Sequence, residues 1–329
     1  MANLTVKNVD VLLCFDKNFI LATGALMTSI LENNQDRFFY FHVCMPDADK
    51  KAVGAALSRL HSRYPQRFAL LFYSFESFNG YEQIAKSVNA RMAAQCVRLF
   101  LGQIPHYHND TIIYVDSDVI CRRSLNELIN TTFDTPILAT QSPDKEIMVY
   151  GHKVRNYFWS GLMVVNVPLW QKQCIEEQAV DFVVKHKPKF PDQDALNVVL
   201  NNNWQALSNY DWHSMWEIKP DTIFLHYVAG KPWFPWHFKG KLNEVNLFRQ
   251  YAKIFEPDVT KWISFRQDKK VFINLSVYSA RFATKWMAKL MFKRRCYKAA
   301  LYFYLRHLQV KVKQKGIIGI ILLRSNSRT

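Results

Sequence analysis

The run Ile112-Ile113-Tyr114-Val115-Asp116-Ser117-Asp118-Val119 decides how the rest of the chain is interpreted. Its apolar first half predicts a buried strand, and that strand delivers two carboxylates, spaced by one residue, to its mouth. We expect the chain to turn there, so that both carboxylates reach one cation. Such oxygen ligands suit hard divalent cations, Mg²⁺ or Mn²⁺, and leave coordination positions for phosphate. Alone, the pair is also compatible with a simple capped turn.

Strand and helix patterns alternate on both sides of this run. Apolar runs predict strands at residues 9–15, 38–43, 68–72, 111–115, 137–139, 162–167 and 222–226. Apolar stripes of helical period predict helices at residues 19–31, 49–60, 91–101, 169–185 and 194–200. This alternation predicts an α/β fold with a mostly parallel central sheet flanked by helices. Ligands bind beyond the carboxyl ends of such strands, where Asp16 and Asp116 are expected.

Two further segments carry candidate site residues. Pro191-Asp192-Gln193-Asp194 opens a predicted helix, so its acids either cap that helix or face a ligand. His226 follows a predicted strand, as a third metal ligand would, although a histidine at a strand end is more often structural. Beyond it, Gly230 permits close approach of the backbone, and Lys231 offers a point charge to a phosphate.

Taken together, these motifs resemble the glycosyltransferase family 8 proteins, which include bacterial lipopolysaccharide glucosyl- and galactosyltransferases. The resemblance runs from about residue 9 to residue 233. It rests on the order of six segments: Asp16-Lys17-Asn18, Arg98-Leu99, Asp116-Ser117-Asp118, Tyr157-Phe158-Trp159-Ser160-Gly161 with Asn166, Asp192-Gln193-Asp194, and His226 with Lys231-Pro232-Trp233. It implies the GT-A fold of nucleotide-diphosphosugar transferases.

The resemblance also implies a role for each site residue. Asp116, Asp118 and His226 would hold Mn²⁺ or Mg²⁺, which bridges the phosphates of a UDP-sugar. Lys231 and the backbone of Gly230 would meet the diphosphate. Asp16 and Asn18 would contact the uracil and ribose. The donor sugar would be lined by Arg98, Asp144, Asp192 and Gln193. Of these, Asp192 and Gln193 are the candidate catalytic residues.

The activity implied is retaining transfer of a hexose from UDP-glucose or UDP-galactose to a lipopolysaccharide core acceptor. Gln193 is a poor nucleophile, so we favour same-face attack over a covalent intermediate on Asp192. One departure bears on the donor: Trp159 stands where the family usually has Asn, and an indole cannot copy the hydrogen bonds of an amide. Trp159 is either core packing or a surface that stacks on a sugar.

Basic charge is concentrated in the last part of the chain. Of 329 residues with a net charge of +16, residues 261–329 hold seventeen Lys or Arg and one acid, Asp268. A basic helix with interleaved aromatic residues is predicted at residues 277–310, which is typical of helices at a lipid surface. We predict a catalytic domain at residues 1–235 and a membrane-associated region at residues 236–329. An anionic membrane surface is the expected partner, and nucleic acid is not.

Six scattered cysteines, with no Cys-x-x-Cys spacing, predict reduced core residues of a cytoplasmic protein rather than disulfides or a zinc site. The longest late apolar run, residues 316–323, is far shorter than the about 20 residues needed to span a bilayer. The expected location is therefore the inner face of the cytoplasmic membrane, as a peripheral protein. Two other functions remain open at this point: a phosphatase with Asp116 as nucleophile, and a non-catalytic adaptor that binds polyanions or membranes.

Overall fold

The structure is a computed structural model. It describes residues 7–143, 146–215, 217–228, 231–233 and 242–258, and the four residues Leu301, Tyr304, Leu305 and Leu308. Two predicted site residues, Asp144 and Gly230, lie outside these ranges. Most of the predicted basic helix at residues 277–310 lies outside them as well.

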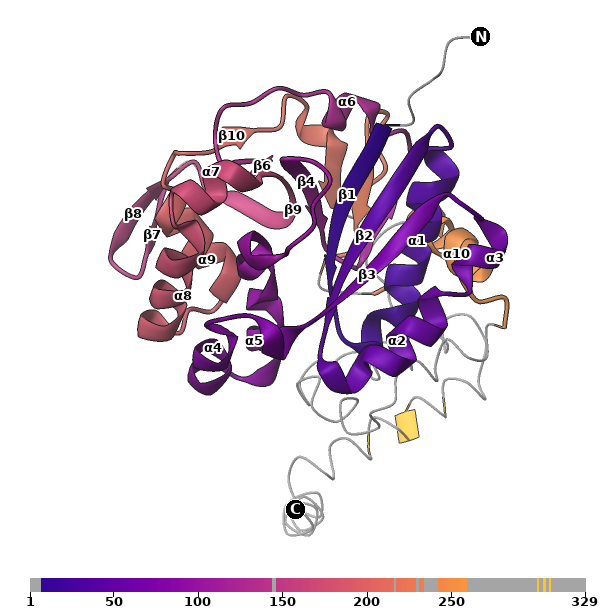
Figure 1. Ribbon diagram of the computed structural model, residues 1–329, viewed down its shortest axis with the longest axis horizontal. Helices are drawn as coiled ribbons and strands as arrows, with labels where there is room; N and C mark the ends of the chain where they lie inside the picture. The colour runs from indigo at the N-terminus through magenta and orange to yellow at the C-terminus, as the bar shows by residue number, and fades with distance from the viewer. Residues whose placement is uncertain are drawn as a thin grey trace, which may run out of the picture. The chain divides into compact units, whose positions relative to one another are not determined.

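A seven-stranded sheet forms the centre, in the order β10-β6-β9-β4-β1-β2-β3 (Figure 1). Its strands are β1 (Lys7–Cys14), β2 (Arg37–Met45), β3 (Phe68–Ser74), β4 (Thr111–Val115), β6 (Ile137–Gln141), β9 (Phe158–Asn166) and β10 (Gln205–Ala206). β9 runs antiparallel to β4 and β6, and the other neighbouring pairs are parallel. The prediction of a mostly parallel α/β sheet is therefore confirmed.

Helices cover both faces of this sheet, because successive side chains of each buried strand point to opposite faces. In β1, Val9, Val11 and Leu13 join the core that contains α1, while Leu12 joins the core beneath α8 and α9. The helices of the first face are α1 (Ile20–Asn33), α2 (Lys50–Leu57), α3 (Leu60–Arg63) and α10 (Leu242–Phe255) (Figure 1). Those of the second face are α4 (Tyr81–Ser87), α5 (Ala90–Cys96), α7 (Val167–Lys172), α8 (Ile175–His186) and α9 (Pro191–Leu200).

Three predicted helices are interrupted. Residues 49–60 form α2 and α3, and residues 91–101 change from α5 to a 3-10 helix at Val97–Gln103. Residues 169–185 form α7 and α8, which are separated at Cys174, where φ is 50°. Because that left-handed conformation cannot continue a right-handed helix, the chain must change direction there. The apolar period continues through these breaks, so it could not reveal them.

A second, three-stranded sheet positions the site. It has the order β11-β12-β5 and consists of β11 (His213–Met215), β12 (Phe224–His226) and β5 (Val119–Cys121). β5 follows β4 after the turn at residues 116–118, and its antiparallel partner β12 places His226 opposite Val119. The backbone N–H of Tyr227 donates to the Asp118 carbonyl at 2.9 Å. The ends of two strands that are far apart in sequence therefore meet. The remaining elements are the hairpin β7 (Glu146–Val149) and β8 (His152–Arg155), and α6 (Asn126–Ile129).

The first residues after position 236 that the structure describes belong to α10. Phe248, Tyr251 and Phe255 of this helix are buried in the same core as α1. The predicted boundary between residues 235 and 236 stays a prediction. Within the described residues, no helix has both the length and the apolar character needed to cross a membrane. Of the described cysteines, Cys44, Cys96 and Cys121 are buried, Cys14 is half-buried, and Cys174 is exposed.

Candidate active site

The two carboxylates after β4 and the histidine after β12 lie together. Nε2 of His226 is 3.6 Å from Oδ2 of Asp116 and 3.2 Å from Oδ1 of Asp118. One ligand atom from each residue lies within 4.8 Å of the other two, close enough for one cation. The structure therefore brings together the three predicted metal ligands, and metal binding itself stays a prediction.

The two carboxylates have different surroundings. Oδ1 of Asp116 accepts from the Tyr114 hydroxyl at 2.6 Å and pairs with Nη2 of Arg98 at 2.9 Å, so Oδ2 is the oxygen that faces His226. Burial raises the pKa of Asp116, although the Arg98 charge opposes this. Burial acts on Asp118 too, but His226 and Lys231, whose Nζ bonds Oδ2, together lower the pKa of Asp118. Asp118 is thus the more firmly ionised of the pair.

A buried chain of side chains orients His226. Its Nδ1 is 3.0 Å from Nε2 of His213, and Nδ1 of His213 is 3.0 Å from the Thr140 hydroxyl. Burial and the neighbouring His226 lower the pKa of His213 well below its ordinary value, so His213 is neutral. When His213 donates to Thr140, its Nε2 accepts the Nδ1 proton of His226. With a cation bound, Nε2 of His226 would then offer its lone pair to that cation beside the two carboxylates.

An irregular stretch of β9 packs against Asp116 and His226. The pairing of β6 with β9 jumps from Ala139–Met163 to Thr140–Trp159, a register shift of the kind found beside active sites. Within the skipped stretch, the Gly161 carbonyl accepts the Asp116 N–H at 2.9 Å. A Cβ at Gly161 would lie 2.6 Å from Cε1 of His226 and 3.0 Å from Oδ2 of Asp116. Only glycine leaves room for the ligands in these positions.

The first turn of α9 faces the same site. The Ser160 hydroxyl donates to Oδ2 of Asp192 at 2.8 Å, and Nε of Arg98 pairs with the same oxygen at 3.2 Å. Gln193 accepts from the Ser160 N–H at 3.2 Å. Capping is performed instead by Asp194, which accepts from the Phe190 N–H at 3.3 Å. Asp192 is therefore held toward Arg98 and the metal ligands, and the capping interpretation applies to Asp194.

Asp16 and Asn18 form a separate group at the same edge of the sheet. Asp16 follows β1, which lies parallel to β4, and its Oδ1 accepts from the Asn18 N–H at 2.9 Å. Burial raises the pKa of Asp16. This contact caps the 3-10 helix Lys17–Phe19, so Asp16 has a structural role whether or not it also contacts a ligand.

The arrangement defines a class of protein. In structure, the chain is similar to the galactosyltransferase LgtC solved with donor and acceptor sugar analogs, with a TM-score of 0.61 at 20% identity. The match covers 78% of this chain and 100% of that one. The chain therefore has the GT-A fold of glycosyltransferases.

Its family follows from the sequence comparison: the chain belongs to glycosyl transferase family 8, whose profile matches residues 10–237. A lipopolysaccharide 1,2-glucosyltransferase of Escherichia coli is 28% identical over 249 residues, which is 67% of this chain and 72% of the relative. A lipopolysaccharide 1,3-galactosyltransferase of Salmonella typhimurium is 24% identical over 323 residues, or 90% and 89% of the two chains. The resemblance stated from the motifs is confirmed, and the chain is a glycosyltransferase.

Proposed function

We propose that this glycosyltransferase moves a hexose, from UDP-glucose or UDP-galactose, to a lipopolysaccharide core oligosaccharide with retention of configuration. The observation that carries the proposal is the meeting of Asp116, Asp118 and His226 beside Arg98 and Asp192. The names of the two relatives, a lipopolysaccharide glucosyltransferase and a galactosyltransferase, support the sugar and acceptor class.

The residues present fit a divalent cation. Oδ2 of Asp116 and Nε2 of His226 face each other, while their other polar atoms are engaged by Tyr114, Arg98 and His213. Two carboxylates with one imidazole suit Mn²⁺, and also accept Mg²⁺. When bound, the ion would neutralise charge on the departing diphosphate.

The remaining donor contacts are proposals of the same kind. Lys231, whose ammonium group bonds to Asp118, is placed to meet a diphosphate held beside that carboxylate, and Gly230 would join it. Asp16 and Asn18 would contact the uridine from the neighbouring strand end. Arg98, Asp144, Asp192 and Gln193 would line the donor sugar.

The surroundings of Asp192 favour same-face attack over a covalent intermediate. Its Oδ2 accepts from Ser160 and pairs with Arg98, and both contacts withdraw electron density from the carboxylate. In same-face attack, a diphosphate oxygen accepts the proton of the acceptor hydroxyl, and Asp192 stabilises the positive charge that develops on the sugar. A trapped glycosyl adduct on Asp192 would exclude this mechanism.

For Trp159, we propose the sugar-stacking alternative. It is half-buried, and its ring lies 6.0 Å from that of the exposed Tyr210. It neighbours Ser160, which binds Asp192. The partly exposed indole of Trp159 would offer its face to a hexose ring.

The two alternative functions were a phosphatase and a non-catalytic adaptor. A phosphatase with Asp116 as nucleophile is not supported, because the chain belongs to a glycosyltransferase family. An adaptor role would not need the three converging ligands. Attachment to an anionic membrane through residues 236–329, on the inner face of the cytoplasmic membrane, stays part of the proposal, with the basic charge of residues 261–329 as its support.

The decisive measurement is release of UDP from a panel of UDP-sugars, with and without Mn²⁺. We expect release to require the metal and to favour UDP-glucose or UDP-galactose. Asp118→Ala is expected to lower it by about 10- to 100-fold or more, because losing even a group that hydrogen-bonds a metal ligand costs about 10- to 100-fold. Asp221→Ala is the matched control, since it removes a carboxylate paired with Arg123 at the surface. Metal-stimulated release that survives in Asp118→Ala would overturn the assignment.

A further inference from the structure

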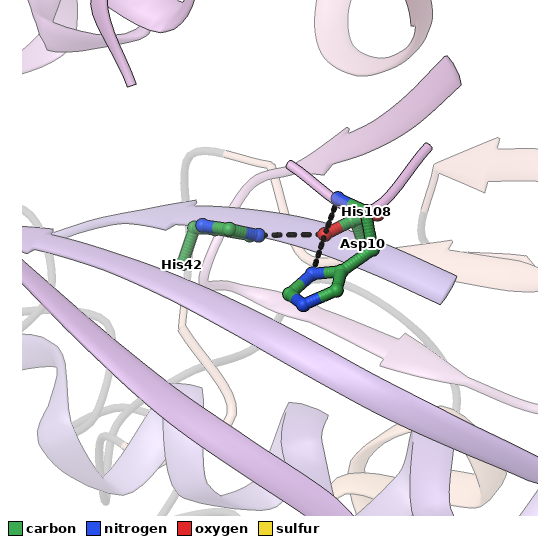
Figure 2. Close-up of side chains that lie close together, drawn as sticks. All are labelled: Asp10, His42 and His108. Carbon is green, nitrogen blue, oxygen red and sulfur yellow. Dashed lines mark hydrogen bonds and ion pairs between the residues drawn. The ribbon is translucent and has the colours of Figure 1, made fainter. Parts of the chain in front are cut away.

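A second cluster of side chains with metal-ligand chemistry lies in the central sheet, away from the ends of β4 and β12. Asp10 is in β1, His42 is in β2, and His108 precedes β4. Figure 2 shows Asp10 between the two imidazoles, with contacts to both. One ligand atom from each residue lies within 4.8 Å of the other two. Three segments distant in sequence therefore converge on one point.

We propose that these three side chains bind a transition-metal ion, with Zn²⁺ as the expected ion. Oδ1 of Asp10 is 2.8 Å from Nε2 of His42 and 3.3 Å from Nδ1 of His108. Ligands at roughly 2.0–2.1 Å from a tetrahedral zinc ion are about 3.3–3.4 Å apart. The His108 separation already has this value, and that of His42 needs to widen by about 0.5 Å.

Neighbouring side chains orient the three proposed ligands, as hydrogen-bond partners of ligands do in metal sites. The Tyr73 hydroxyl lies 3.2 Å from Nδ1 of His42, which leaves Nε2 for a metal. Asn109 donates to Oδ2 of Asp10 at 2.7 Å, and the backbone N–H of His108 donates to Oδ1 at 3.2 Å and to Oδ2 at 3.1 Å, so the second lone pair of Oδ1 is the one that would meet a metal. The ring of Tyr40 stacks on that of His108. Each proposed ligand is thus held by a contact with a neighbouring side chain.

The choice of metal follows from the donor atoms. Two imidazoles and one carboxylate favour Zn²⁺ and its neighbours Co²⁺, Ni²⁺ and Cu²⁺, whereas the active site, with two carboxylates and one imidazole, suits Mn²⁺ or Mg²⁺. The ion also has a path to the site. Asp10 and His42 are fully buried, but the His108 side chain is 35% exposed. It borders a surface cavity of about 190 Å³, from which water can supply the fourth ligand.

Such an ion would join β1, β2 and the segment before β4, so its expected effect is on stability rather than on chemistry. The experiment uses the full-length chain with Asp118→Ala, which removes a ligand of the active site and isolates the second site. After equilibration with buffered Zn²⁺ and gel filtration, we expect about one equivalent of bound zinc, a Tm raised by several degrees, and with Co²⁺ the visible absorption of a tetrahedral ion.

Adding His108→Ala removes a proposed ligand, so it is expected to abolish the bound zinc and the Tm shift. The fold should tolerate this change, because the His108 side chain is partly exposed. His106→Asn in the same loop is the matched control, since Asn tolerates the φ of 110° found there, and it is expected to retain both effects. If the alanine variant is insoluble, His108→Gln replaces it, because an amide still donates to Asp10. Equal zinc content with and without His108, or no zinc in the Asp118→Ala chain, would overturn the proposal and leave a hydrogen-bonded network alone.

Discussion

Replacing Gly161 with alanine tests how closely the proposed metal ligand His226 packs on β9. The added Cβ would lie 2.6 Å from Cε1 and 2.9 Å from Nδ1 of His226. Carbon atoms pack at about 3.5–4.0 Å, so the imidazole must move by about 1 Å. That movement breaks the 3.0 Å contact between His226 and His213. Misplacing a group in an active site by about 1 Å lowers the rate about 100-fold, and overpacking destabilises by about 1–3 kcal/mol.

The assay is UDP release titrated with Mn²⁺, together with thermal unfolding. We expect Gly161→Ala to lower kcat/KM for the donor about 100-fold, to raise the half-saturating concentration of Mn²⁺, and to lower Tm by a few degrees. Gly161 does not have a positive φ, so alanine fits its backbone and the effect is one of space alone.

Gly54→Ala is the matched control. This glycine lies in α2, and the nearest atom to an added Cβ is Cζ of Phe72 at 3.9 Å, an ordinary contact. Alanine in a helix interior is preferred to glycine by about 0.5–1 kcal/mol, so we expect equal or higher stability and unchanged activity. If Gly161→Ala binds Mn²⁺ and releases UDP as the wild type does, the packing of β9 against His226 is not what positions the ligand.

Two further predictions concern pH and the membrane. Burial raises the pKa of Glu176 to about 7 from 4.5; the folded chain therefore holds this proton more tightly than the unfolded chain. Ionising it between these values destabilises the fold, by at most about 3 kcal/mol. Glu176→Gln removes the titrating group and keeps an acceptor for Gln103. In urea unfolding, we expect this variant to be no more stable than the wild type near pH 4 but more stable near pH 8. A stability difference that does not change with pH would contradict this. Removing residues 261–329, with their seventeen basic residues, is expected to release the protein from anionic vesicles in a sedimentation assay, and unchanged sedimentation would refute membrane docking through this region.

The central sheet was predictable because its strands are local apolar runs between turns. β4 has the predicted bounds, Thr111–Val115, and β1, β2 and β3 differ from prediction by a few residues. β9 was predicted to begin at residue 162, and it begins at Phe158. Its first residues, Phe-Trp-Ser-Gly, lack a strand pattern, and their path depends on contacts with β4 and α9. A local pattern does not encode the direction of pairing or a register shift, so the irregular stretch appeared only in the structure.

In the candidate site too, some residues could be predicted from the sequence and others could not. Asp116 could be predicted because it ends a strand of the parallel sheet, where ligands bind. His226 was predicted from its place after an apolar run, and it ends β12 of the second sheet, whose antiparallel pairing with β5 brings it to Asp118. His213 and Thr140 were missed, although they orient His226. His213 is 13 residues from His226 in sequence and 73 from Thr140, and neither partner belongs to a motif. Hydrogen bonds that close a network over such separations follow from the folded backbone, and the types of the two residues alone do not indicate them.

The charges at the site bear on the order in which ligands bind. Three carboxylates at the site face two permanent cations. Arg98 pairs with Asp116 and Asp192. Lys231 pairs with Asp118. A diphosphate that approaches this excess of negative charge is repelled, whereas a divalent cation reverses the excess. Lys231 can then exchange Asp118 for a phosphate oxygen. The balance of charge therefore supports binding of the metal before the donor, and the apparent KM for the donor is expected to fall as Mn²⁺ rises, which the titration of the wild type measures.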